Sequence, residues 1–395
     1  MKRLQRTRKL RAAALSLYHT FQDQGQQTSQ IETHFAGSYD PFDTLAIPRT
    51  SQIDELLQFD RTYLSPAFGT SKILLHPSAA YLQDELAAYG FLARIAAVKA
   101  RCDPHPEALH VVLKLKAKAM QKLRLNLSQA AFACLPRAVM SLLYAETWCH
   151  NLEAVAVHLR LLEVINNHYG LKIQDLICIL HSDIQRATLT LESPLFKMDS
   201  STWHILEADY LPFLRHRAGT SDGVQWPPRQ PLLEMKKALA ALDVLRTSET
   251  SETARQAATI KFLHLMRTLL VQYNTSSDNV DQYVALAALY RLRLEANMER
   301  IPLFQITVFD AGKVILSRLK ELLTVVSKDP PDVRLWVLFV GTMSGDSWFE
   351  KEFTIQAEAL GLVSSADVKA VLNVFEHQDL LDLPLSACSI LQGAG

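Results

Sequence analysis

The sequence is poor in cysteine, with only five in 395 residues, and these five are widely separated. No pair has the Cys-x-x-Cys spacing of a zinc or redox site, and an odd number cannot all form disulfides within the chain. We therefore expect reduced and mostly buried thiols, as in intracellular proteins. The positions are Cys102, Cys134, Cys149, Cys178 and Cys388.

Long apolar runs are also missing. The longest, LWVLFVGTM at residues 335–343, has about half of the roughly 20 residues that a membrane helix needs. The basic start is followed by RAAALSLYHTF, which lacks the apolar segment and the cleavage site of a secretory signal. We expect neither membrane insertion nor secretion of this chain.

Charge of one sign is nowhere in excess except at the start of the chain. The 41 basic and 41 acidic residues balance, so no global field attracts nucleic acid, membranes or acidic substrates. The first acidic residue is Asp23, after a cluster of six basic ones: Lys2, Arg3, Arg6, Arg8, Lys9 and Arg11. Three interpretations stay open: weak, non-specific contact with DNA phosphates, a mitochondrial transit peptide, and a nuclear-import or merely solvated tail.

Motifs for nucleotide or acyl chemistry are missing as well. The stretch GTSDG at residues 219–223 has two glycines, but neither the preceding strand nor the lysine of a phosphate-binding loop. No Gly-x-Ser-x-Gly elbow occurs. Asp346 and Glu350 could act as acid and base, yet Ser344 or Asp346 more simply caps a helix that begins near Trp348. We predict no catalytic and no cofactor-binding residue.

Histidines and acids gather in one stretch, residues 150–168, but not in a metal-binding arrangement. Zinc ligands on a helix lie three or four residues apart on one face. Beyond the first pair the spacing is five residues or more, so the side chains do not converge. The residues concerned are His150, Glu153, His158, Glu163 and His168. We predict packing and surface hydrogen bonds for them, and no metal site.

What the sequence does have is helical periodicity. Apolar residues three or four positions apart recur along most of the chain, which is the pattern of one buried helix face. Polar stretches at residues 209–231 and 247–253 predict surface loops, and no fixed-period repeat is present. We predict an all-α, single large multi-helix domain of about a dozen helices. Their expected ranges are 79–101, 107–127, 135–150, 152–168, 171–189, 232–246, 254–273, 280–298, 311–326, 333–343, 348–359 and 364–375.

An extended strap precedes these helices, with the sequence FAGSYDPFDTLAIPRT at residues 35–50. Four apolar side chains could anchor it across a helical surface, and two prolines restrict its backbone and lower the entropy lost on ordering. The anchors are Tyr39, Phe42, Leu45 and Ile47, and the prolines are Pro41 and Pro48. We favour this structural interpretation over a partner-binding motif, and divide the chain into a basic segment, 1–34, and a helical domain, 35–390.

Two motifs at opposite ends of the chain resemble those of one known group of proteins. The first is the basic cluster followed by Asp40, Pro41 and Phe42. The second lies in residues 334–375 and consists of Trp336, Phe339, Gly341, Trp348, Phe349, Leu360, Gly361, Val371, Leu372 and Phe375. In order and spacing they resemble the fungal-specific transcription factor regulatory domain, over residues 1 to about 380.

The resemblance implies an all-α regulatory domain of a nuclear regulator, often of metabolic or secondary-metabolite genes. Many members carry a six-cysteine zinc binuclear cluster before this domain, whereas the first cysteine here is Cys102. Whether an upstream exon encodes such a six-cysteine cluster stays open. Relatives also tend to have a tryptophan where this chain has Ser365 or Ala366, so the last helix could pack differently.

The sequence thus favours a non-enzymatic transcriptional regulator in the nucleus, with cytoplasm or mitochondrion as alternative locations. It could act through protein partners, a homodimer, a small-molecule effector or its basic arm. The alternative is a pathway-associated enzyme or small-molecule-binding protein with an apolar cavity between helices.

Overall fold

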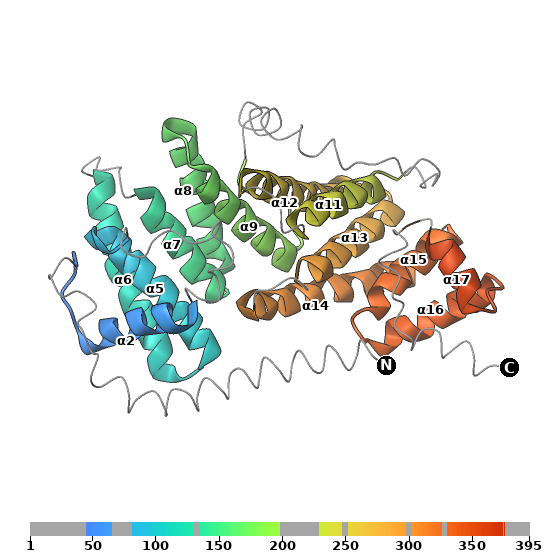
Figure 1. Ribbon diagram of the computed structural model, residues 1–395, viewed down its shortest axis with the longest axis horizontal. Coiled ribbons are helices and arrows are strands. Elements are labelled where there is room, and N and C mark those ends of the chain that lie inside the picture. The colour runs from blue at the N-terminus through green and yellow to red at the C-terminus, as the bar shows by residue number, and fades with distance from the viewer. Residues whose placement is uncertain are drawn as a thin grey trace.

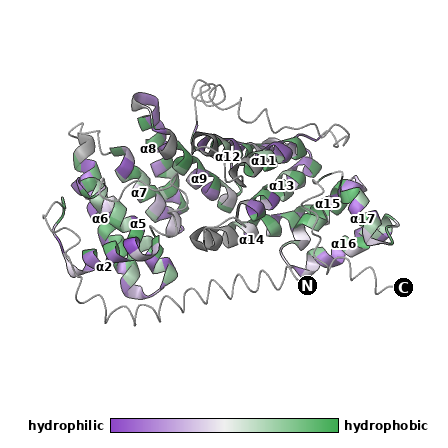
Figure 2. Cartoon of the chain, viewed as in Figure 1, coloured by the Kyte–Doolittle hydropathy of each residue, from purple (hydrophilic) through white to green (hydrophobic). Residues whose placement is uncertain are grey.

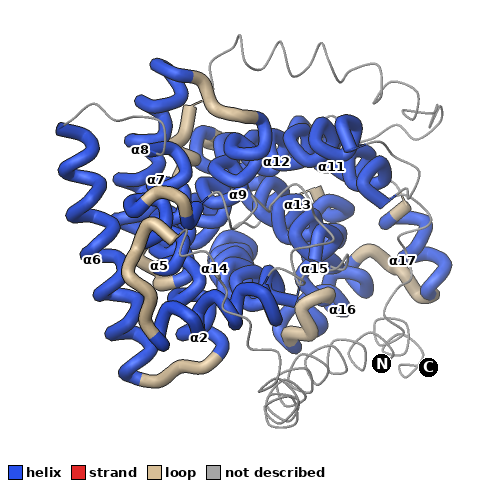
Figure 3. Tube along the Cα trace, turned by 60° about the vertical axis from the view of Figure 1, so that its left-hand side comes forward, coloured by secondary structure: helices blue, strands red, loops and turns tan. Residues whose placement is uncertain are grey.

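The computed structural model describes residues 45–64, 81–128, 135–197, 229–246, 252–297, 302–325, 330–373 and 375. These residues form 13 α-helices and one π-helical turn, and they include no strand (Figure 3). The predicted all-α, multi-helix fold is confirmed.

Two groups of helices follow one another along the chain (Figure 1). The first group is α2 (Ser51–Phe59) with its π-helical extension η2 (Asp60–Leu64), α5 (Glu85–Cys102), α6 (Pro106–Ser128), α7 (Leu135–Trp148), α8 (Leu152–Tyr169) and α9 (Ile173–Thr190). The second group is α11 (Gln230–Arg246), α12 (Glu252–Thr275), α13 (Asn279–Asn297), α14 (Pro302–Val325), α15 (Pro331–Thr342), α16 (Ser347–Ala359) and α17 (Ser365–Leu372).

Helix α9 joins the two groups. It packs against α7 and α8 on one side and against α12 and α14 on the other, and it lies between the groups in Figure 1. In the first group α5 packs against α2, α6 and α7, and in the second α13 contacts α11, α12, α14 and α15. Helices α16 and α17 both pack on α15 at the end of the molecule.

One hydrophobic cluster runs through both groups, from Ile47 to Phe375. Side chains from the first group, such as Leu159, and from the second, such as Leu289 and Trp336, are fully buried in it. The outer helices α6 and α8 carry hydrophilic residues beside hydrophobic ones along their length (Figure 2). Among the described helices, none has the combination of length and apolar character needed to cross a bilayer.

The twelve predicted helices are all present, and the structure adds one that the prediction missed. This is α2, where the side chain of Thr50 caps the helix by accepting a hydrogen bond from the amide of Ile53 at 3.3 Å. Helix α14 begins at Pro302 rather than at residue 311. Proline is favoured in the first turn of a helix because its missing N–H has no partner there in any case.

The end of the predicted strap lies against the first group of helices. Ile47 is buried, Leu45 packs on the same core, and the amide of Ala46 donates to the carbonyl of Leu82 at 3.0 Å. The predicted anchoring by Leu45 and Ile47 is confirmed. The other two anchors, Tyr39 and Phe42, and Pro41 between them lie outside the described residues.

We expect Ile47→Ala to lower the free energy of unfolding by about 2–3 kcal/mol, because truncation leaves an unfilled space under the strap. Pro48→Ala is the matched control, since Pro48 is exposed and its replacement removes no core contact. Urea unfolding followed by far-UV circular dichroism measures both. Equal stabilities for the two variants would show that the strap contributes nothing to the core.

Candidate functional site

The predicted site residues fall into two sets. The basic cluster and the Asp40-Pro41-Phe42 motif lie outside the described residues. The second set, Trp336, Gly341, Trp348 and Phe349, lies in α15 and α16. For the second set, the structure therefore shows how the residues of the motif pack.

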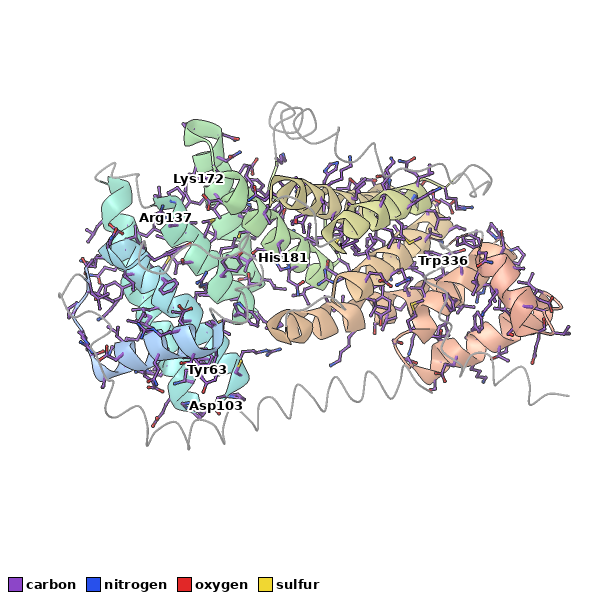
Figure 4. The ribbon with its side chains drawn as sticks, viewed as in Figure 1. Tyr63, Asp103, Arg137, Lys172, His181 and Trp336 are labelled. Carbon is purple, nitrogen blue, oxygen red and sulfur yellow. The ribbon has the colours of Figure 1, made fainter. Side chains whose placement is uncertain are left out.

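The aromatic residues of the second motif pack together around α15. Trp336 is fully buried and stacks on Phe375, with ring centroids 5.9 Å apart and an interplanar angle of 22°. This contact ties α15 to the residues that follow α17, and Figure 4 shows Trp336 among these last helices. Trp348 and Phe349 meet edge to face at 4.9 Å, and the ammonium of Lys320 lies over both rings, at 5.7 and 5.6 Å. The motif is thus a packed structural unit.

Gly341 has a specific steric reason to be glycine. A Cβ atom added there would lie 2.1 Å from Cδ1 of Phe349, whose ring is fully buried. Real carbon atoms cannot approach so closely, and interiors are packed too densely for the ring to move aside freely. The ring of Phe349 on α16 therefore fills the space that a side chain at Gly341 on α15 would occupy.

The turns at both ends of α16 also follow from the motif. Of the two caps that the sequence offered, Ser344 and Asp346, it is Asp346 that caps the helix by accepting from the amide of Trp348 at 3.0 Å, and it pairs with Lys320 at 2.6 Å. Partial burial opposes ionisation, but these two hydrogen bonds and the Lys320 charge outweigh it and lower the pKa of Asp346. At the other end Gly361 has φ +69°, and the amide of Leu362 donates to the carbonyl of Ala357 at 3.0 Å. This is the Schellman C-cap, which requires a residue in the left-handed conformation.

The histidines of residues 150–168 serve helix ends and packing. His150 has φ 56° and follows the end of α7, where its amide donates to the carbonyl of Thr147 at 3.2 Å. His158 is buried beside the ion pair of Lys116 and Glu146, and burial lowers its pKa, aided by Lys116 and opposed by Glu146. Within the described ranges, no group of three His, Cys, Asp or Glu side chains could hold a metal ion.

The described thiols are free, and their surroundings make them poor nucleophiles. Cys178 is buried in α9, and burial raises its pKa to about 11. Cys102 and Cys149 are half-buried, and burial raises the pKa of each. The thiolate is the reactive form, so these three cysteines are suited to packing. Cys134 and Cys388 lie outside the described residues.

A buried polar network, which the sequence analysis missed, holds the chain after α9. Asp183 is 1% exposed, and its two oxygens accept from the amides of Leu195 and Phe196 at 2.9 and 2.8 Å. Arg267 of α12 donates to the same carboxylate at 3.3 Å, and Arg186 lies 3.7 Å from it. Burial raises the pKa of Asp183, although the two amides and both arginines oppose the change.

The second feature of α9 is a contact with a cation that none of the described carboxylates neutralises. Arg293 of α13 is 7% exposed, and its guanidinium donates to Oε1 of Gln185 and, at 3.3 Å, to Oγ1 of Thr188. Both acceptors are neutral, and Nε of Arg293 has no hydrogen-bond partner. Among the described ion pairs none involves Arg293, and burial alone lowers its pKa to about 10.

His181 lies on α9 one helical turn before Gln185, and the charge of Arg293 acts on its ring. Figure 4 shows it on the central helix α9. Burial and then the charge of Arg293 lower the pKa of His181 to about 4, so its ring is neutral at pH 7. We call His181, Gln185, Thr188 and Arg293 the α9–α13 polar site. Gln185 and Arg293 are 108 residues apart, so their contact could not be predicted from local sequence. The available signal was Arg293 itself, a charged residue at a helix position where the pattern favours an apolar one.

The fold and this site define an all-α protein with a buried cationic group between two central helices. Comparison of the chain with protein-family models, with curated proteins and with solved structures finds no match in any of the three.

Proposed function

We propose that the protein is a fungal-type transcriptional regulator whose helical regulatory domain works without a zinc binuclear cluster. One observation carries the proposal: the spaced residues of the C-terminal motif interlock. Trp336 stacks on Phe375, and Gly341 makes room for the ring of Phe349. These motif positions therefore have a packing role in the core. The all-α fold is the architecture that the resemblance implies.

In this proposal the helical domain supplies contacts to protein partners, and the regulator acts in the nucleus on metabolic or secondary-metabolite genes. The test is a tethered reporter assay, in which the full chain is fused to an unrelated DNA-binding domain with a binding site upstream of a reporter gene. We expect activation or repression relative to the DNA-binding domain alone. Unchanged reporter output at equal protein level would contradict a regulatory role.

The basic cluster is the proposed contact with nucleic acid. Such contacts read phosphates and not bases, so we expect dissociation constants of about 10⁻⁴–10⁻⁶ M, no preference for sequence, and an affinity that falls steeply with salt. Deletion of residues 1–12 should abolish this binding and leave the melting temperature nearly unchanged. Salt-titrated fluorescence anisotropy with a promoter fragment and a scrambled duplex measures it. Tight, salt-tolerant preference for one duplex would show that another part of the chain reads DNA.

A further inference from the structure

Arg293 differs from the other buried arginines of the described chain in its electrostatic partner. Arg186 lies beside Asp183 and donates to Glu192 at 2.7 Å, and Arg291 pairs with Glu295. The guanidinium of Arg293 is comparably buried but has only the neutral oxygens of Gln185 and Thr188. A buried charge without a counterion destabilises a fold by several kcal/mol, so this arrangement requires a reason.

The guanidinium also retains unused hydrogen-bonding capacity. An arginine has five N–H donors, and Gln185 and Thr188 accept from two of them. Nε–H has no acceptor, and together with a neighbouring Nη–H it forms the edge of the group that carboxylates and phosphates contact in a bidentate manner. The two neutral acceptors fix the plane of the guanidinium and leave this edge without an anion.

We propose that Arg293 binds the carboxylate of a small, largely apolar monoanion at the α9–α13 polar site. The negative charge of the ligand then takes the place of the missing counterion, and Gln185 and Thr188 act as positioning residues that orient the guanidinium.

The chemical class of the ligand follows from the charges and from the neighbouring side chains. One guanidinium provides a single positive charge, and the imidazole of His181 is neutral at pH 7, which suits a monocarboxylate better than a phosphate dianion. The two helices that carry the site are otherwise packed in the hydrophobic core, to which Ile184 of α9 and Leu292 of α13 belong. A ligand bound there would lie in apolar surroundings, so the rest of it is aliphatic or aromatic.

This inference does not depend on transcriptional regulation. The ligand is an effector if the protein is a regulator, and a bound metabolite if the alternative small-molecule-binding function holds. The outcome of the binding experiment below is therefore independent of the outcome of the reporter assay.

The first experiment is a thermal melt of the purified full chain with a panel of acids and their neutral amides. The probes are acetate, benzoate, cyclohexanecarboxylate and octanoate, each compared with its amide, with inorganic phosphate as a further control. A ligand that binds only the folded state raises the folding equilibrium constant about 11-fold at ten times its Kd. We expect the melting temperature to rise with the concentration of an apolar acid and not with that of its amide.

The second experiment assigns the effect to Arg293. Arg293→Met removes the charge but keeps an unbranched chain of similar length, so we expect a melting temperature at least as high as that of the wild type and loss of the response to the acid. Arg267→Met is the matched control, because it removes a partly buried arginine that already has Asp183 as its partner. This variant should melt lower and keep the full response to the acid.

Arg293→Lys keeps the positive charge but lacks the bidentate edge, so its response to the acid should be weaker than that of the wild type and not lost. The proposal is overturned if no acid of the panel stabilises the wild type beyond its amide. It is equally overturned if Arg293→Met responds as the wild type does, because the anion then binds elsewhere.

Discussion

Gly341→Ala should lower the free energy of unfolding by about 3 kcal/mol, the upper part of the range for inserting atoms into a well-packed core. The added methyl group would lie 2.1 Å from Cδ1 of Phe349, and this ring has no exposed surface into which it could turn. Either α15 and α16 move apart or the ring of Phe349 leaves its place, and both outcomes remove contacts between the two helices. Urea unfolding followed by circular dichroism measures the loss.

Two further variants make this prediction specific. Gly312→Ala adds the same methyl group in α14, 3.3 Å from Cε2 of Tyr290; the tight contact offsets the gain in helix propensity, so the change should stay within about 1 kcal/mol. In a Phe349→Leu background, Gly341→Ala should cost clearly less than in the wild type, because the ring that it meets is gone. Equal losses in both backgrounds would mean that Gly341 does not make room for Phe349.

Asp183→Asn should lower the free energy of unfolding by about 3–5 kcal/mol, the usual loss when one member of a buried ion pair is removed. The replacement has nearly the same volume, so no cavity confounds the result. It leaves the partly buried charge of Arg267 without its carboxylate and removes the buried carboxylate beside Arg186, which keeps the exposed Glu192 as a partner. Its amide group also presents N–H donors to the amides of Leu195 or Phe196, which need an acceptor.

Glu321→Gln serves as the control for Asp183→Asn. It neutralises a carboxylate that pairs with Arg318 at 2.7 Å on the surface, where both side chains are largely exposed, and such pairs contribute less than about 1 kcal/mol. The same unfolding experiment compares the two variants. If Asp183→Asn is no more destabilising than Glu321→Gln, the Asp183 network does not hold the chain after α9.

The fold was predictable from the sequence because it depends on local patterns. Apolar residues three or four apart gave twelve helices, and the cap at Asp346 followed from the residues just before α16. Helix α2 was not predicted because it has only 9 residues and directly follows the proline-containing strap, although Ile53, Leu56 and Leu57 have helical spacing and are buried. Its buried face and its Thr50 cap were the available signals.

The candidate site was not predictable in the same way, because it depends on which helices meet. Arg267 reaches Asp183 across 84 residues, and Arg293 reaches Gln185 across 108. Nothing in either local sequence specifies these partners. The steric role of Gly341 is intermediate: the resemblance marked the position, but only the packing of α15 on α16 shows that Phe349 requires it.

The central claim, that this chain regulates transcription, is tested most directly by nascent-transcript sequencing after rapid depletion. The protein is tagged with an inducible degron in its native host, and transcription is measured within minutes of its loss, before secondary changes accumulate. The account predicts a small, reproducible set of genes, clustered in metabolic function, whose transcription changes at once and recovers when the protein is restored. Unchanged nascent transcription after complete depletion, under conditions in which the protein is expressed, would contradict it.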